Sequence, residues 1–290
     1  MRCCKRWNSV VLVAALLGVV CVSSTSHAQR SAVQTASAFE VASVKVGVPD
    51  DVPTGIRPVS AGGQFRAVLT VHDLVQVAYG APLALLPSQV IGGPDWVATE
   101  RFEIVAKANG LANAPSGGRD ELLAMMRTLL AGRFRLQIRK ESRELAIFNL
   151  VLDRPDRRLG PRLHPADGQC VATSATTGAA VDPSNWCGFR RFTPSAISAR
   201  GMTLDAFASG ISTRADIQRV VRDRAGLAGN FDLDVDYTPD AVAPGESQSA
   251  SAERIGLSTA MKEQLGLRLE SAKGPVDVFI IDYVERPMPD

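Results

Sequence analysis

The sequence predicts an α+β protein in which one small domain occurs twice in tandem, with helices packed on a mixed or antiparallel sheet. Three observations lead to this prediction. Residues 64–152 and 196–284 carry the same order of strand and helix signals, their apolar residues share the same periodicities, and glycines follow corresponding elements. We therefore expect each copy to run strand, helix, strand, strand, helix, strand, strand.

Each copy opens with a strand that leads into a helix. The first copy has Phe65–Leu69 followed by Thr70, and the second has Ile197–Met202 followed by Thr203. A threonine at this position can cap a helix with its hydroxyl group. Apolar residues then fall at helical spacing, at Val71, Leu74 and Ala78 in the first copy and at Leu204, Phe207 and Ile211 in the second.

A short β-prone segment and a longer strand follow in each copy. Val90–Gly93 in the first copy corresponds to Val220–Val221 in the second. Phe102–Val105 corresponds to Phe231–Val235, and both segments alternate apolar and polar residues as a strand with one wet face does. We therefore expect both segments to lie in a sheet.

A second helix and a hairpin are predicted to close each copy. The helix through Leu122–Leu130 is expected to end at Gly132, and the helix through Leu257–Leu265 at Gly266, because glycine commonly follows the last helical residue. The predicted hairpins are Phe134–Ile138 with Leu145–Leu152, and Leu267–Leu269 with Val276–Val284, the latter turning at Lys273–Pro275.

The remaining segments define the predicted boundaries. An additional strand at Phe39–Val44 extends the first copy to residues 39–152, and the second copy covers 192–286. Residues 153–191 are rich in Pro, Gly, Ser, Thr and Arg and are predicted to form a long ordered loop. A similar stretch at 239–252 is predicted to be a flexible exposed loop that interrupts the second copy.

Residues 1–28 have the pattern of a secretory signal peptide. Basic residues precede an apolar run of 13 residues from Val10 to Val22, and small polar residues follow up to Ala28. A membrane-spanning helix needs roughly 20 apolar residues, so a permanent anchor is the weaker alternative. Lipidation of Cys21 is another alternative, although Val20 stands where a lipoprotein signal has glycine or alanine. We expect cleavage after Ala28 and a periplasmic or secreted protein without a membrane span.

Signal cleavage leaves two cysteines, Cys170 and Cys187. In an oxidising compartment we expect them to form one disulfide, which stabilises a loop of this size by about 3 kcal/mol in the chain-entropy model. The alternatives are a metal pair or a reactive thiol. Two cysteines without a nearby histidine cluster make a poor zinc site.

The mature part is close to electrically neutral. Three of the 32 basic residues lie before the cleavage point and none of the 30 acidic ones does, which leaves 29 − 30, or −1. We therefore expect neither nucleic acid nor an anionic membrane as a partner. The 46% share of hydrophobic residues is typical of a folded chain.

The sequence contains no GxSxG, SxxK, Walker or HExxH motif. The two histidines of the mature part, His72 and His164, lack neighbours at the spacing of metal ligands. Asp232, Asp234 and Asp236 alternate along one strand and are expected on its solvated face rather than as an acid–base pair. We predict no catalytic residue, no metal and no cofactor.

Candidate binding residues lie in the Gly92–Trp96 turn and on the last strands of the first copy. Trp96 offers a large amphipathic contact, and we expect it to be buried and to close the turn rather than to serve as a ligand platform. Arg135, Arg139 and Arg143 are expected on the wet face of the first hairpin. Contact with an acidic partner surface is their alternative role.

Five segments carry a resemblance to a known family: FEVASVK, GGQF, IGGPDW, LLAGRFRLQIRKESRELAIFNLVL and QLGLRLESAKGPVDVFIIDYVERP. They resemble a family of secreted proteins of unknown function from soil bacteria of the acidobacterial kind, over nearly the whole mature chain. The family pattern Thr-Gly-Leu-x-Gly-x-Tyr-Asp is replaced here by RAGLAGNFD at residues 224–232. The domain also resembles extracytoplasmic parts of sensor metallopeptidases, whose activity needs the missing HExxH motif. Each copy is similar to the short N-terminal domain of secretins and TonB-dependent receptors, which implies a protein-docking module.

These observations predict an exported, non-catalytic binding or interaction module of the cell envelope, with another envelope protein or a peptide as partner. Edge strands of small sheets can accept a partner strand, and helices leave a groove beside them. The alternative is an extracytoplasmic hydrolase whose active site is assembled from loops. A deep pocket with convergent polar groups and shifted pKa values would favour the hydrolase.

Overall fold

The computed structural model describes residues 37–49, 51–57, 59–60, 62–80, 83–108, 118–166, 190–239 and 255–287, which belong to one compact unit. The predicted signal peptide, Cys170 and Cys187, and most of the 239–252 loop lie outside these residues. None of the helices in the described ranges is both long and apolar enough to cross a membrane.

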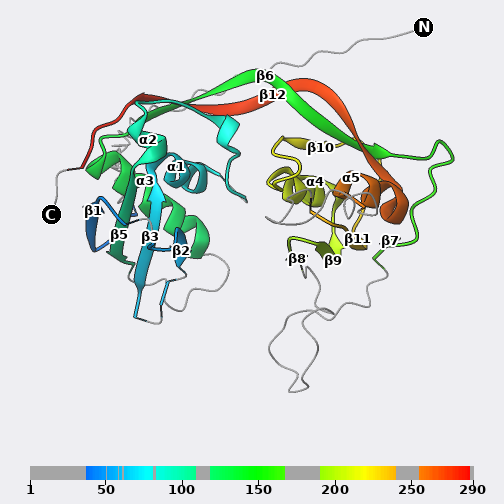
Figure 1. Ribbon diagram of the computed structural model, residues 1–290, viewed down its shortest axis with the longest axis horizontal. Coiled ribbons are helices and arrows are strands. Elements are labelled where there is room, and N and C mark those ends of the chain that lie inside the picture. The colour runs from blue at the N-terminus through cyan, green and yellow to red at the C-terminus, as the bar shows by residue number, and fades with distance from the viewer. Residues whose placement is uncertain are drawn as a thin grey trace, which may run out of the picture. The chain divides into compact units, whose positions relative to one another are not determined.

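The structure is α+β, as predicted, and its described strands form three four-stranded sheets (Figure 1). Two sheets are antiparallel, with the orders β1-β5-β3-β2 and β7-β11-β9-β8, and the third is mixed, with the order β10-β6-β12-β4. Each antiparallel sheet packs with helices around its own hydrophobic core. The mixed sheet contributes side chains to both cores.

The first core lies between one antiparallel sheet and three helices. The strands are β1 (Val41–Val46), β2 (Gly55–Arg57), β3 (Gln64–Thr70) and β5 (Arg101–Lys107), and the helices are α1 (Val71–Tyr79), α2 (Trp96–Thr99) and α3 (Gly118–Arg133). Thr70 caps α1 as predicted, because its hydroxyl accepts a hydrogen bond from the Asp73 backbone N–H at 3.1 Å. Phe102 is fully buried at the centre, where its ring meets Phe134 edge-on with centroids 5.1 Å apart.

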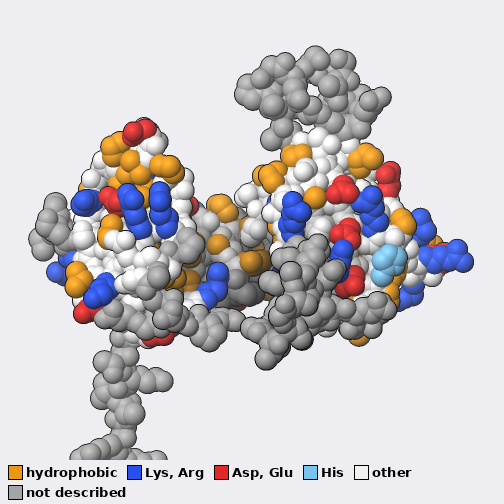
Figure 2. All heavy atoms as spheres, turned by 90° about the horizontal axis from the view of Figure 1, so that it is seen from below, with side chains coloured by type: hydrophobic (Ala, Val, Ile, Leu, Met, Phe, Trp, Pro, Cys, Tyr) orange, Lys and Arg blue, Asp and Glu red, His pale blue; other side chains and the backbone are white. Residues whose placement is uncertain are grey.

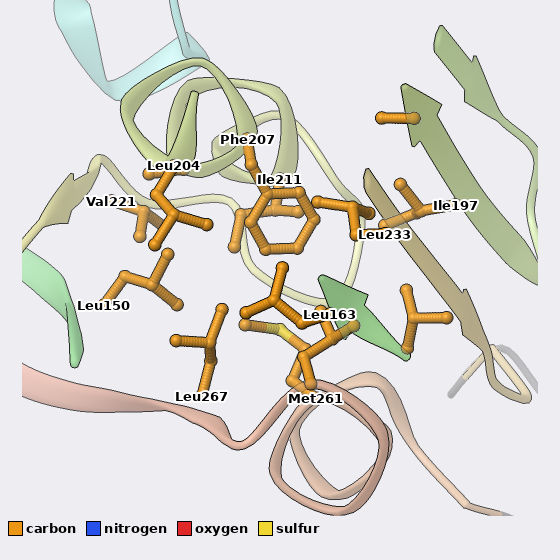
Figure 3. Packing of buried hydrophobic residues seen from close by; sticks show 14 of the residues in the cluster. Leu150, Leu163, Ile197, Leu204, Phe207, Ile211, Val221, Leu233, Met261 and Leu267 are labelled. Atoms are coloured by element: carbon orange, nitrogen blue, oxygen red, sulfur yellow. The ribbon is translucent and has the colours of Figure 1, made fainter. Parts of the chain in front are cut away.

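The second core has a similar construction (Figure 3). Its strands are β7 (Leu163–Pro165), β8 (Arg190–Phe192), β9 (Ala196–Met202) and β11 (Phe231–Asp236), covered by α4 (Leu204–Ser212), α5 (Leu257–Ala260) and the π-helical turn η4 (Met261–Leu265). Thr203 caps α4 by accepting from the Ala206 N–H at 3.2 Å. Phe207 is fully buried in this core. The segment 153–191, predicted to be a loop, thus contains β7 and the first residues of β8.

The two predicted hairpins are wrong, because each is one continuous strand. Strands β6 (Gln137–Leu152) and β12 (Leu267–Tyr283) run antiparallel to each other along their whole lengths and form a ribbon that passes over both groups of elements (Figure 1). Gly274 does not turn the chain. It makes room for Ile147, whose Cδ1 would lie 2.8 Å from a Cβ at this position. Pro275 lies outside Phe279–Ile281, the part of β12 that pairs with β4. A missing N–H is tolerated where a strand has no partner on that side.

Two short strands extend the ribbon on its two sides, and each runs parallel to the long strand of the other half. Strand β4 (Val90–Gly92) pairs with β12, and β10 (Val221–Asp223) pairs with β6. Val90 lies opposite Phe279 and Val221 opposite Phe148, so the same offset of 131 residues (221 − 90 and 279 − 148) relates both pairs. These registers agree with the hypothesis of an internal duplication. They also mean that, in the mixed sheet, the short strand of each half pairs with the long strand of the other half.

The helix ends differ between the halves. Helix α3 continues through Gly132, so the predicted stop there is wrong. The left-handed residue is instead Arg135, with φ = 49°, after Phe134 N–H has donated to Leu130 O at 3.1 Å. In the second half Gly266 takes the left-handed conformation with φ = 69°, as predicted.

Candidate ligand-binding cleft

A cleft of about 320 Å³ lies beneath the middle of the ribbon, between the segment that follows α1 and the C-terminal end of α4. Figure 2 shows hydrophobic side chains gathered in this hollow, with charged side chains on the surfaces around it. Ligand pockets of proteins usually measure about 300–1,000 Å³, so the cleft is large enough for a small molecule.

The first wall is built by the chain folding back over the end of α1. Gly80 permits this, because a Cβ there would lie 2.4 Å from Leu83 O and 2.6 Å from Gln76 O. The Leu85 N–H donates to Gln76 O at 2.9 Å and fixes the returning segment. Leu83 and Tyr79 both line the cleft, and the centroid of the Tyr79 ring is 5.5 Å from that of Phe279.

The second wall is formed by α4 and β10, which Ser212 holds together. Its buried hydroxyl donates to Ala208 O at 2.8 Å and accepts from the Val221 N–H at 2.9 Å. This bond satisfies an N–H that an edge strand would otherwise leave unpaired. Ser209 and Val221 face the cleft from this wall.

The charged groups of the cleft neutralise each other. Lys140 on β6 and Asp277 on β12 form an ion pair at 2.7 Å, and both side chains are more than half exposed. Gln89 donates to the Asp277 carbonyl at 2.9 Å and accepts from the Leu86 N–H at 3.0 Å. The described lining therefore carries no net charge.

Two hydroxyl groups of the lining, those of Tyr79 and Ser209, have no hydrogen-bond partner among the described residues. Burial raises the pKa of Tyr79, and the positive charge of Arg127 partly opposes this shift. The phenol is therefore protonated at neutral pH and can donate a hydrogen bond. Both hydroxyls are available to a bound molecule.

The two histidines of the described residues, His72 and His164, lie on different elements. His72 on α1 lies with Nδ1 2.7 Å from Gln76 Nε2 and Nε2 3.4 Å from Val90 O, and the nearby Asp73 carboxylate, 4.0 Å from Nδ1, raises its pKa. His164 is exposed on β7 opposite Asp232. Neither lines the cleft, and the part of the chain that the structure describes holds no cluster of three or more potential metal ligands.

The predicted binding residues lie outside the cleft. Arg135 pairs with Glu285 at 3.1 Å, while Arg139 and Arg143 both bind Glu141, at 2.7 and 2.9 Å. The three aspartates expected on the solvated face of a strand are also engaged, since Asp232 accepts from the Gly201 N–H, Asp234 binds Arg200 and Asp236 binds Arg162. On the ribbon itself, the ion pairs of Arg139 and Arg143 with Glu141 partly compensate the positive charge that an acidic partner would bind.

Trp96 is buried, with 9% of its surface exposed, and its ring meets Phe102 edge-on at 6.0 Å under the guanidinium of Arg286. We expect Trp96→Ala to lower the free energy of unfolding by about 3 kcal/mol, because it opens a cavity beside Phe102. Denaturant unfolding followed by circular dichroism measures this loss, and Trp96→Phe should recover part of it. Unchanged stability of Trp96→Ala would contradict the structural role.

The residues of the cleft were not identified from the sequence. Tyr79, Ser209 and Phe279 belong to segments far apart in the chain, and only the crossed strand pairing brings them together. One signal was present: Ser212 continues the apolar stripe of α4, and a serine at such a position needs a partner when buried.

Comparison with known protein families matches residues 72–284 to a family described as proteins of unknown function, DUF3738. No curated protein and no solved structure matches the chain.

Proposed function

The chain belongs to the DUF3738 family, and we propose that it is an exported, non-catalytic binding protein of the cell envelope that holds a small molecule in the cleft beneath the ribbon. The cleft, with apolar side chains on both walls and two unpartnered hydroxyls, is the observation that carries the proposal. The signal pattern of residues 1–28 supports export.

Binding is favoured over hydrolysis because most polar groups of the cleft are already occupied. Ser212 and Gln89 use their hydrogen-bonding atoms to connect elements of the fold, and Lys140 and Asp277 bind each other. Nucleophilic catalysis needs a hydroxyl or thiol hydrogen-bonded to a base. The described lining contains no such pair.

A small molecule is favoured over the peptide strand that the sequence suggested as a partner. Next to the cleft, the β10 edge is closed where the Val221 N–H binds Ser212, and β4 is covered by His72 at Val90 O. An added strand needs a row of open backbone groups. Docking of a peptide at the outer antiparallel sheets remains a separate hypothesis.

The proposal is tested by native mass spectrometry of the protein purified from the envelope of its own host. We expect an additional mass on the wild-type protein that is absent from Ser209→Phe, because the larger side chain fills the cleft. Ser258→Phe, on the exposed face of α5, is the matched control and should keep the ligand. An adduct retained by Ser209→Phe, or none on the wild-type protein, would contradict the proposal.

A further inference from the structure

From the chemistry of the cleft, and resting on the proposed function, we infer that its ligand is an uncharged small molecule that has an apolar body and carries a hydrogen-bond acceptor. Three properties of the lining lead to this class: its charge, its apolar surface and its free donors.

The charge of the lining favours an uncharged ligand over a strongly charged one. Lys140 is the one cation and Asp277 the one anion among the described lining residues, and they are 2.7 Å apart. An anionic ligand would have to compete with Asp277 for Lys140, and a cationic ligand with Lys140 for Asp277. A charged ligand therefore gains no net electrostatic attraction from the lining and still loses part of its own hydration on binding. A neutral molecule avoids this cost.

The walls present apolar surface from both halves. Tyr79, Leu83 and Phe279 lie on one side, and Val221 lies on the other. Leu83 is 39% exposed, which makes it one of the few large hydrophobic side chains on the described surface. Removing such a surface from water favours a ligand with an aliphatic or aromatic body.

The free donors determine where the ligand is polar. The hydroxyls of Tyr79 and Ser209 have no partner in the described part of the chain, and burial keeps the pKa of Tyr79 above its usual value. An acceptor such as a carbonyl, ether or hydroxyl oxygen can bind these hydroxyls. The volume of about 320 Å³ lies at the lower end of the range of ligand pockets, which favours a compact molecule of two or three rings or the equivalent chain.

A matched pair of fluorescent probes tests this class. N-phenyl-1-naphthylamine is neutral, and 8-anilino-1-naphthalenesulfonate has the same ring system with one added negative charge. We expect the neutral probe to bind the wild-type protein at one site and at least tenfold more tightly than the sulfonate. Equal or tighter binding of the sulfonate would overturn the inferred neutrality of the ligand, and no binding of the neutral probe would overturn its apolar body.

Two variants separate this inference from the proposed function. Asp277→Asn leaves Lys140 unpaired, so the sulfonate should bind several-fold more tightly while the neutral probe changes little. An unchanged preference in Asp277→Asn would overturn the charge argument alone. Ser209→Phe should abolish binding of both probes, and Ser258→Phe should not. If Ser209→Phe binds both probes like the wild-type protein, the cleft is not their site and the proposed function fails with the inference.

Discussion

Gly160→Ala is expected to lower the free energy of unfolding by about 3 kcal/mol, because the backbone at this position touches another backbone segment. A Cβ on Gly160 would lie 2.4 Å from Gln264 O and 2.5 Å from Gly266 N. Unlike the end of a side chain, these atoms cannot rotate away. The Gly160 N–H also donates to Leu265 O at 2.9 Å, so separating the segments would weaken the bond that caps η4.

Gly132→Ala is the matched control for this prediction. Gly132 lies in the last turn of α3, and a Cβ there has no atom within 4 Å. Alanine in a helix is more favourable than glycine by roughly 0.5–1 kcal/mol, so this variant should be slightly more stable. Urea unfolding of both variants provides the measurement. A Gly160→Ala protein as stable as the wild type would show that the two segments are not in contact.

Local elements were predictable because their signals depend on neighbouring residues. The caps at Thr70 and Thr203 need only a hydroxyl before an apolar helical stripe, and both were found where expected. The alternation in Phe231–Val235 identified β11, and Gly266 ends η4 in the left-handed conformation. Such patterns are set by the period of the element rather than by its partners.

The ribbon could not be predicted from the same kind of signal. Gly274 and Pro275 are typical turn residues, and they suggested a hairpin. In the structure the glycine accommodates Ile147, and the proline occupies a stretch of β12 that has no partner on its outer side. Both reasons depend on residues more than 100 positions away, so the residues next to Gly274 and Pro275 do not indicate them.

The cleft was unpredictable for a related reason. Its walls come from α1 and its return segment, from α4 and β10, and from the middle of the ribbon. Tyr79 and Ser209 are unremarkable residues near the ends of two helices. Their hydroxyls become a site only because β4 and β10 pair with the long strand of the other half and bring both helix ends beneath the ribbon.

The crossed strands lead to the last prediction, that a cavity in the first core destabilises the second core as well. Phe102 is fully buried against Phe134 and Trp96, and Phe102→Ala should cost about 4 kcal/mol. When the first core unfolds, β4 and the C-terminal part of β12 lose their place in the mixed sheet, and β6 is no longer held along its whole length. Strand β6 is also the partner of β10 and of the N-terminal part of β12 in the second half, so the second core loses support as well. The two halves should therefore unfold in one cooperative transition.

Hydrogen exchange measures this coupling residue by residue. In Phe102→Ala we expect the most protected amides of α4 and β11, in the second half, to lose the same free energy of opening as those of β5. Phe207→Ala, which empties the corresponding place in the second core, should in turn lower the protection of β5. Independent domains would behave differently, since each substitution would then affect its own half alone and urea unfolding would show two transitions. That result would mean that the ribbon connects the halves without coupling their stabilities.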